Sequence, residues 1–185
     1  TVMAEPVAIG PAPDLSGGAA PALAAMAEQL AAMLGAAGIP AQAAGDIRPW
    51  LWTKLFYNAA LNPLGALLKV HYGALGADPE LRRIMDTIMH EAFALAQRLE
   101  VRVPFRSAAD YLSVFYDRLL PATFDHRPSM LADLEYRGRT EIGALNGRIV
   151  EMAADIGLDA PANRMITALI AARERNWRPA RQEDQ

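Results

Sequence analysis

Three polar side chains recur at helical spacing within residues 52–62, which read WTKLFYNAALN. Lys54, Asn58 and Asn62 stand at intervals of four residues, and on an α-helix that interval places all three on one face. The residues between them are mostly apolar, so the remaining surface of such a helix is expected to be buried. Because burying a polar group without a partner costs about 2–7 kcal/mol, we expect a ligand or fixed protein partners to satisfy this face.

Two interpretations of this polar face are open. In the first, Lys54 extends along the helix to solvent, and the two asparagines hydrogen-bond to loop backbone. In the second, the face presents one cation and two amides to a bound ligand. A single lysine would favour the first interpretation, but three polar groups in register on an apolar helix do not decide between them.

The composition limits the classes of function. The chain has 185 residues, enough for one domain or one domain plus part of another. It carries 18 Lys and Arg against 21 Asp and Glu, a net charge of −3, which predicts no nucleic-acid or membrane-surface role because either needs a basic patch. There is no cysteine and there are three scattered histidines, so we expect no disulfide and no metal site. Without a long apolar run or an apolar leader, the sequence predicts a cytoplasmic protein.

The first 45 residues differ in pattern from the rest. Residues 1–13 and 39–44 favour β-strands, and the alanine-rich residues 19–34 favour a helix between them. The sequence has neither a G-x-G-x-x-G loop nor a G-x-x-x-x-G-K-[ST] loop. We therefore interpret residues 1–45 as the end of an α/β domain, of Rossmann type, whose main part is not in this sequence.

Residues 46–185 are predicted to be helical almost throughout. The expected helices cover residues 46–70, 78–100, 107–120, 129–133, 140–156 and 162–177. Pro63 should free backbone carbonyls in the first of these helices, and Gly73 with Gly76 is expected to form a loop. Glu91 is interpreted as part of a solvated helix face, and Asn146-Gly147 as a close contact between helices.

Four stretches, in this order and spacing, resemble one family. They are W-T-K-L-F-Y-N-A-A-L-N-P-L (52–64), S-M-L-A-D (129–133), R-T-E-I-G-A-L-N-G (139–147) and G-L-D-A-P-A-N (157–163). Together they resemble the C-terminal domain of ketopantoate reductases, also called 2-dehydropantoate 2-reductases. The resemblance covers about residues 46–175, and residues 1–45 resemble the last strand–helix–strand of the family's nucleotide domain.

The resemblance implies a fold, a reaction and a cofactor. The fold is an all-helical domain of the 6-phosphogluconate dehydrogenase-like type, preceded by the strand–helix–strand remnant of a Rossmann domain. The reaction is the NADPH-dependent reduction of 2-dehydropantoate to pantoate, on the pathway to pantothenate and coenzyme A. The domain division is 1–45 and 46–185. Since the phosphate-binding loop is not in the sequence, the chain is expected to be a fragment that is inactive alone.

The resemblance also assigns roles to five residues. Lys54 matches the catalytic lysine, Asn58 and Asn62 the substrate-binding asparagines, Ser129 a substrate-binding serine, and Glu141 an acidic residue of the family motif. An ammonium beside a keto oxygen can stabilise the charge that arrives with hydride and can donate a proton, whereas an arginine guanidinium keeps its proton. For Glu141, orienting the lysine and bonding to substrate or cofactor remain alternatives. Taken singly, Ser129 and Glu141 are also typical helix-start residues.

One position departs from the family pattern. Tyr72, before Gly73, stands where the family often has an asparagine that helps to bind substrate. Tyr72 is therefore a candidate pocket residue, and its bulk favours an alternative substrate, another 2-oxo acid. A second alternative is a helical module that binds a partner or dimerises without catalysis. In either case we expect a homodimer, because residues 1–45 carry apolar strands without a sheet to join.

Overall fold

The structure, a computed structural model, describes residues 6–11, 21–136 and 138–176. The chain divides into two compact units. The first comprises residues 1–53 with 101–104, and the second comprises residues 54–100 with 105–185. All six residues singled out from the sequence lie in the second unit, which we call the helical unit.

The first unit contains one helix and two short strands. Strand β1 (Val7–Ile9) pairs in parallel with β2 (Ala41–Ala43), and Val7 lies opposite Ala41 in the register. Helix α1 (Pro21–Ala36) connects them, as a parallel pair requires a crossover. The predicted strand–helix–strand order is confirmed among residues 7–43. The parts of those predictions that cover residues 1–5 and 12–20 lie outside the described residues.

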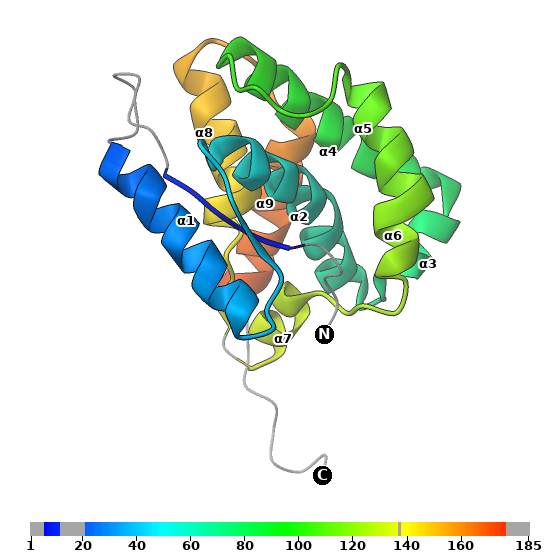
Figure 1. The fold of residues 1–185 in the computed structure, drawn as a ribbon. Coiled ribbons are helices and arrows are strands. Elements are labelled where there is room, and N and C mark those ends of the chain that lie inside the picture. Colours follow the sequence, from blue (N-terminus) through cyan, green and yellow to red (C-terminus); the bar gives the residue numbers. More distant parts are fainter. Residues whose placement is uncertain (1–5, 12–20, 137, 177–185) are drawn as a thin grey trace. The chain divides into compact units, whose positions relative to one another are not determined.

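Helix α2 (Arg48–Leu68) continues from Lys54 onward among the helices of the helical unit, as Figure 1 shows. Asp46 accepts a hydrogen bond from the backbone N–H of Arg48 at 2.9 Å and so caps the start of the helix. Residues 59–66 are buried without interruption, and this run includes Asn62 and Pro63. A helix that is buried all round must have neighbours on every side, which explains why this segment is apolar apart from Asn62.

Helix α3 (Tyr72–Ala77) lies where the glycine-rich loop was predicted, so that prediction is wrong. The two glycines serve packing rather than chain reversal. A Cβ atom on Gly73 would collide with the ring of Phe124, and a Cβ atom on Gly76 would collide with the side chain of Leu120. The residues at these two positions are small because other segments lie directly against the helix.

Helix α4 (Pro79–Arg98) begins where the sequence predicted it. The Asp78 carboxylate accepts hydrogen bonds from the backbone N–H groups of Glu80 and Leu81, and Pro79 occupies the first turn. Ser107 caps the next helix, α5 (Ala108–Val114), in the same way. The helical path continues through η1 (Phe115–Leu119), a π-helical segment, into α6 (Leu120–Ala122).

The last helices carry the remaining family motifs. Helix α7 (Ser129–Tyr136) begins at Ser129 and is longer than predicted. The next helical path starts with the π-helical segment η2 (Gly143–Gly147), continues as α8 (Arg148–Asp155), and ends at Gly157, which has a positive φ of 68°. Helix α9 (Pro161–Arg175) follows. The prediction of a mainly helical protein is confirmed.

Candidate functional site

The polar face of α2 changes in exposure along its length. Lys54 is exposed, Asn58 is half-buried, and Asn62 is 7% exposed. Lys54 reaches solvent within the helical unit, as the first of the two interpretations expected for it. Asn62, by contrast, lies in the buried part of the helix and needs a partner. The face leads from an exposed cation to an enclosed amide.

Asn62 has a fixed partner on α3. The Tyr72 hydroxyl donates a hydrogen bond of 2.5 Å to Asn62 Oδ1, and both side chains are buried. Burial raises the pKa of Tyr72 well above its ordinary value, so the phenol keeps the proton that it donates. The structure thus brings together two of the six residues predicted to form the site.

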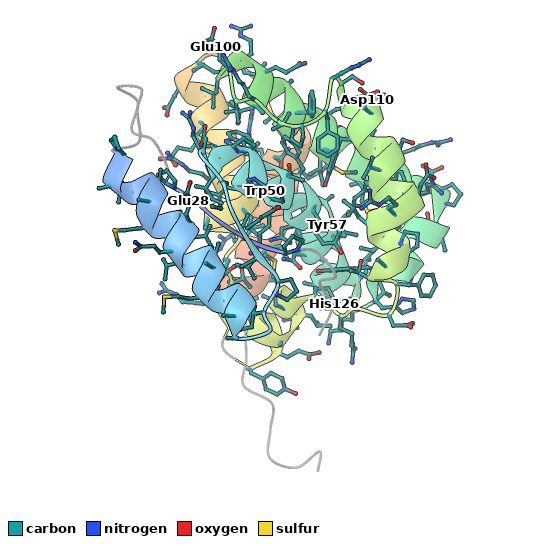
Figure 2. The ribbon with its side chains drawn as sticks, in the orientation of Figure 1. Glu28, Trp50, Tyr57, Glu100, Asp110 and His126 are labelled. Atoms are coloured by element: carbon teal, nitrogen blue, oxygen red, sulfur yellow. The ribbon has the colours of Figure 1, made fainter. Side chains whose placement is uncertain are left out.

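An aromatic cluster lies beside these two residues. The Tyr57 ring packs edge-on against the rings of Tyr72 and Phe115, with centroid distances of 6.0 and 5.9 Å. Its hydroxyl lies 2.5 Å from Thr123 Oγ1, which itself donates to the Leu119 carbonyl at 2.9 Å. Since the threonine proton is used in that bond, Tyr57 is the donor of the shorter one. Figure 2 labels Tyr57 among the side chains of the helical unit, and these contacts make it a packing residue.

The sequence neighbours of Ser129 and Glu141 meet in one apolar cluster. Met130 follows Ser129, Ile142 follows Glu141, and both pack in a cluster with Ala66 of α2. The loop before α7 also lies close to α2, since a Cβ atom on Gly65 would lie 2.5 Å from Pro128 Cγ. These contacts bring the backbone at both predicted site residues to the same end of α2 as Asn62.

The side chains of Ser129 and Glu141 are exposed. Glu141 lies in a bend just before η2, not in a first helical turn as predicted, while Thr140 Oγ1 accepts from the Ile142 N–H as an N-cap does. Within the described residues, no hydrogen bond or ion pair joins the side chains of Lys54, Asn58, Ser129 and Glu141 to one another. The structure therefore positions these four groups without connecting them directly.

Pro63 creates a hydrogen-bonding requirement inside α2. Proline has no N–H, so the carbonyl of Ala59, four residues earlier, lacks its helical partner. The amide Nδ2 of Asn146, fully buried on η2, donates to that carbonyl at 3.0 Å. The freed carbonyl that the sequence predicted is thus paired with a side chain 87 residues away. The contact that Asn146-Gly147 makes is a polar one, and not only the close packing that was expected.

The same network continues to α4 and α9. Asn146 Nδ2 also donates to Asn163 Oδ1 at 3.0 Å, and Asn163 Nδ2 donates to Glu91 Oε2 at 2.8 Å. The Glu91 carboxylate accepts two further bonds, from the backbone N–H groups of Ala162 and Asn163 at 2.9 and 3.0 Å. The interpretation of Glu91 as a solvated residue is therefore wrong, because it caps the start of α9, where the helix dipole favours a carboxylate.

Sequence reasoning missed this network of Glu91, Asn163 and Asn146, although one signal was present. A proline inside a buried helix demands a donor for the carbonyl four residues earlier, and a buried asparagine is a suitable donor. The position of that asparagine in the sequence gave no indication of which carbonyl it serves.

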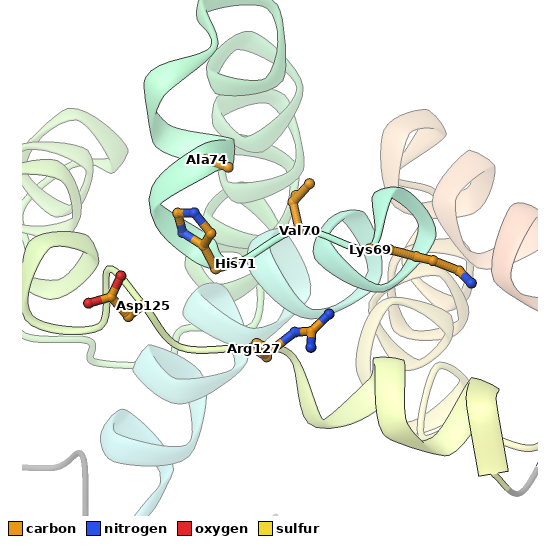
Figure 3. Close-up of a pocket in the computed structure, with 6 residues that line it drawn as sticks. All are labelled: Lys69, Val70, His71, Ala74, Asp125 and Arg127. Atoms are coloured by element: carbon orange, nitrogen blue, oxygen red, sulfur yellow. The ribbon is translucent and has the colours of Figure 1, made fainter. Parts of the chain in front are cut away.

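A hollow of about 340 Å³ lies near the junction of α2 and α3. Figure 3 shows that its wall comes from two segments, residues 69–74 and residues 125–127. Backbone bonds hold these segments together, because the N–H groups of Tyr72 and Gly73 donate to the carbonyls of His126 and Phe124. None of the six predicted site residues lines this hollow.

Neither a metal site nor a membrane-spanning helix is found in the described part of the chain. No group of three His, Cys, Asp or Glu side chains among residues 6–11, 21–136 and 138–176 is arranged to hold a metal ion. Within those same ranges, no helix combines the length and the apolar character needed to cross a bilayer.

Comparison with known proteins decides the family. Residues 46–174 match the family described as "Ketopantoate reductase PanE/ApbA C terminal". The chain belongs to this family. The resemblance inferred from residues 52–64, 129–133, 139–147 and 157–163 is thereby confirmed.

Relatives and solved structures agree with this assignment. A 2-dehydropantoate 2-reductase of Aquifex aeolicus is 42% identical over 138 residues, which are 75% of this chain and 44% of that protein. The ketopantoate reductase structure from Ralstonia eutropha JMP134 superposes with a TM-score of 0.73 at 30% identity, over 94% of this chain and 53% of that one. D-mandelate dehydrogenase with NADH and anilino(oxo)acetate gives a TM-score of 0.74 at 26% identity, over 83% of this chain and 62% of that one. The chain spans less than half the length of the Aquifex relative.

Proposed function

We propose that this chain supplies the helical, substrate-binding part of an NADPH-dependent reductase that converts 2-dehydropantoate to pantoate. The observation that carries the proposal is the face of α2 formed by Lys54, Asn58 and Asn62. Apart from the bond from Tyr72 to Asn62, its side-chain groups have no hydrogen-bond partner among the described residues. Family membership supports the same reaction, because relatives matched over three quarters of this chain are named 2-dehydropantoate 2-reductase.

The proposed roles follow from the chemistry of each group. The exposed Lys54 ammonium stabilises the negative charge that develops on the keto oxygen and donates a proton to it. Asn58 and Asn62 bond to the substrate's oxygens without adding charge. Ser129, at the first residue of α7, donates to the substrate carboxylate. Glu141, just before η2, orients Lys54 or accepts a hydrogen bond from the substrate hydroxyl or the cofactor ribose.

NADPH, when bound, supplies the hydride. The donors on α2 fit a small substrate with keto and carboxylate oxygens, and the sequence contains no glycine-rich loop that would fit the cofactor's phosphates. We therefore propose that a nucleotide-binding domain, of which residues 1–45 are the last elements, holds the cofactor, and that residues 46–185 act on the substrate. On this proposal the chain alone does not turn over.

A second candidate function is the reduction of a different 2-oxo acid. It is favoured by Tyr72, which replaces a family asparagine, and by the structural likeness to D-mandelate dehydrogenase, a protein of different substrate. A non-catalytic helical module is the third candidate. It would keep the packing of α2 but would have no use for its open polar face.

NADPH oxidation by the polypeptide that carries this chain together with its nucleotide-binding domain distinguishes these candidates. The assay compares two substrates, ketopantoate and 2-oxo-2-phenylacetate. Each substrate is measured once with NADPH and once with NADH. We expect turnover of ketopantoate with NADPH. Turnover of only the phenyl substrate would transfer the proposal to the second candidate, and no turnover of any 2-oxo acid would support the helical module.

We also propose that the protein is a cytoplasmic homodimer. Four large apolar side chains of α1 are 46–67% exposed, namely Leu23, Met26, Leu30 and Met33. Exposed apolar surface of this kind favours association with another surface. A clean monomer in gel filtration at high protein concentration would contradict the dimer.

A further inference from the structure

The hollow near the junction of α2 and α3 is built on a connected frame. Its wall combines residues 69–74 with residues 125–127, and the Tyr72 N–H donates to the His126 carbonyl at 3.0 Å to join the two segments. The rings of the same two residues also pack together, with 5.3 Å between their centroids. A volume of about 340 Å³ lies within the range of small-molecule sites. The protein therefore holds this space open without a ligand.

Lys69 stands where helices usually end in glycine. It follows the last residue of α2 and has a positive φ of 58°, and the N–H of Val70 donates back to the Gly65 carbonyl at 3.1 Å. Glycine is the usual residue in this conformation, because a Cβ atom crowds the backbone there. The ion pair of Lys69 with Glu135 is long, at 3.9 Å, and joins two groups in contact with solvent, so it holds the ammonium only weakly. The ammonium stays available to a ligand in the hollow that Lys69 lines.

The other polar groups of the wall have unused hydrogen-bonding capacity. Arg127 and Asp125 are exposed, and neither side chain makes a hydrogen bond or an ion pair with another described residue. His71 Nδ1 lies 2.9 Å from the Phe124 carbonyl oxygen. Because a carbonyl oxygen only accepts, Nδ1 carries a hydrogen, and Nε2 of the neutral ring remains an acceptor. The fold leaves a guanidinium, a carboxylate and an imidazole nitrogen free to bind a ligand.

The charges of the wall are separated by sign. Figure 3 shows Asp125 beyond His71, away from the side chains of Lys69 and Arg127. The cationic end suits a carboxylate, which an arginine can hold through two parallel N–H bonds. A simple carboxylate would leave Asp125 without a partner, and a dianion such as phosphate would be repelled by it. An ammonium at the other end of the ligand would satisfy the Asp125 carboxylate.

We propose that the hollow binds a small zwitterion, a molecule with a carboxylate at one end and an ammonium at the other. The carboxylate bonds to Lys69 and Arg127. The ammonium bonds to the Asp125 carboxylate and to His71 Nε2. The polar face of α2 contributes no residue to this wall, so the inference does not depend on the proposed reaction.

Calorimetric titration of the polypeptide with its nucleotide-binding domain tests the site. The probes are 4-aminobutanoate, 4-hydroxybutanoate and butanoate, which share one carbon chain and differ only at its far end. We expect 4-aminobutanoate to bind about 10-fold more tightly than the other two probes. Arg127→Gln should weaken the binding of 4-aminobutanoate and of butanoate by about 10-fold. Asp125→Asn should weaken 4-aminobutanoate alone by about 10-fold, because only this probe carries an ammonium.

Lys54→Ala is the control for binding at the polar face of α2, and it should leave the affinity for 4-aminobutanoate unchanged. Absence of 4-aminobutanoate binding would overturn the inference. Butanoate binding as tightly as 4-aminobutanoate would also overturn it, and equal binding of 4-hydroxybutanoate would replace the zwitterion by a hydroxy acid. Binding that Lys54→Ala abolishes and Arg127→Gln leaves intact would move the ligand to the face of α2. None of these results changes the reduction of ketopantoate, so the proposed function is tested separately.

Discussion

Two groups of polar side chains contact the buried half of α2, and they differ in how their hydrogen bonds are used. Around Asn146, the bonds run from the Ala59 carbonyl through Asn163 to Glu91, and they link α2, η2, α9 and α4. Around Asn62, one bond from Tyr72 fixes the amide, and the amide nitrogen stays open. The first group uses its hydrogen bonds to connect helices of the fold. The second group leaves a donor that can bind a ligand.

The difference teaches how a buried polar group can be interpreted. A buried asparagine is evidence for a binding site only when some of its donors or acceptors are left over after its protein partners are counted. By that criterion Asn62 belongs to the candidate site. Asn163 and Glu91 belong to the internal hydrogen-bond network around Asn146, which we call the framework. Asn146 is intermediate, because its Nδ2 serves two acceptors while its Oδ1 has no partner among the described residues.

The largest expected effect on stability comes from breaking the framework at Asn146. Asn146→Leu removes the donor to the Ala59 carbonyl and to Asn163 Oδ1, and leaving these acceptors unpaired should cost about 3 kcal/mol of unfolding free energy. Asn58→Leu on α2, beside Ala59, is the matched control, and it should change the unfolding free energy by less than about 0.5 kcal/mol. Urea unfolding of both variants measures the contrast. Equal losses would remove the distinction between the two groups.

A smaller effect is expected where the loop before α7 lies on α2. Gly65→Ala places a methyl group within 2.5 Å of Pro128 Cγ, and overpacking of this kind costs about 1–3 kcal/mol. Because Ser129 follows Pro128 directly, kcat/KM should fall as well. Gly143→Ala is the control, since a Cβ atom there meets nothing within 4 Å. If Gly65→Ala leaves both stability and kcat/KM as they are, the two segments are not in contact in solution.

The smallest effect is expected at the far end of the framework. Glu91→Gln keeps the size of the side chain but removes the charge at the start of α9 and replaces one acceptor oxygen by NH₂. We expect a loss of about 1 kcal/mol in unfolding free energy. Glu151→Gln, on the exposed face of α8 beside Arg148, should change it by less than about 0.5 kcal/mol. A Glu91 effect no larger than that of Glu151 would show that the capping bonds contribute nothing.

Local signals in the sequence predicted much of this fold. The carboxylate of Asp78 and the positive φ of Gly157 mark helix ends that could be read from residue type alone. The missing N–H of Pro63 predicted a free carbonyl, which the structure confirms at Ala59. Each of these features depends on residues within one helical turn of the feature itself.

The remaining features depend on contacts that the local sequence does not encode. Gly73 and Gly76 have the composition of a loop, but they lie in α3 because Phe124 and Leu120 pack against them. Glu91 is a single carboxylate on α4, and its partners, the N–H groups at the start of α9, are more than 70 residues away in the sequence. The open Asn62 donor could be located only after Tyr72 was seen to occupy the other end of the amide.

The central claim is that the polar face of α2 binds and protonates the substrate, whereas the framework around Asn146 only stabilises the fold. The most direct test is Lys54→Ala in the polypeptide with its nucleotide-binding domain, measured by NADPH oxidation with ketopantoate and by urea unfolding. Because Lys54 is exposed and has no partner among the described residues, unfolding should change by less than about 0.5 kcal/mol, while loss of the proton donor should lower kcat about 10³-fold. A variant that keeps its full kcat, or one that loses activity only because it unfolds, would contradict the claim.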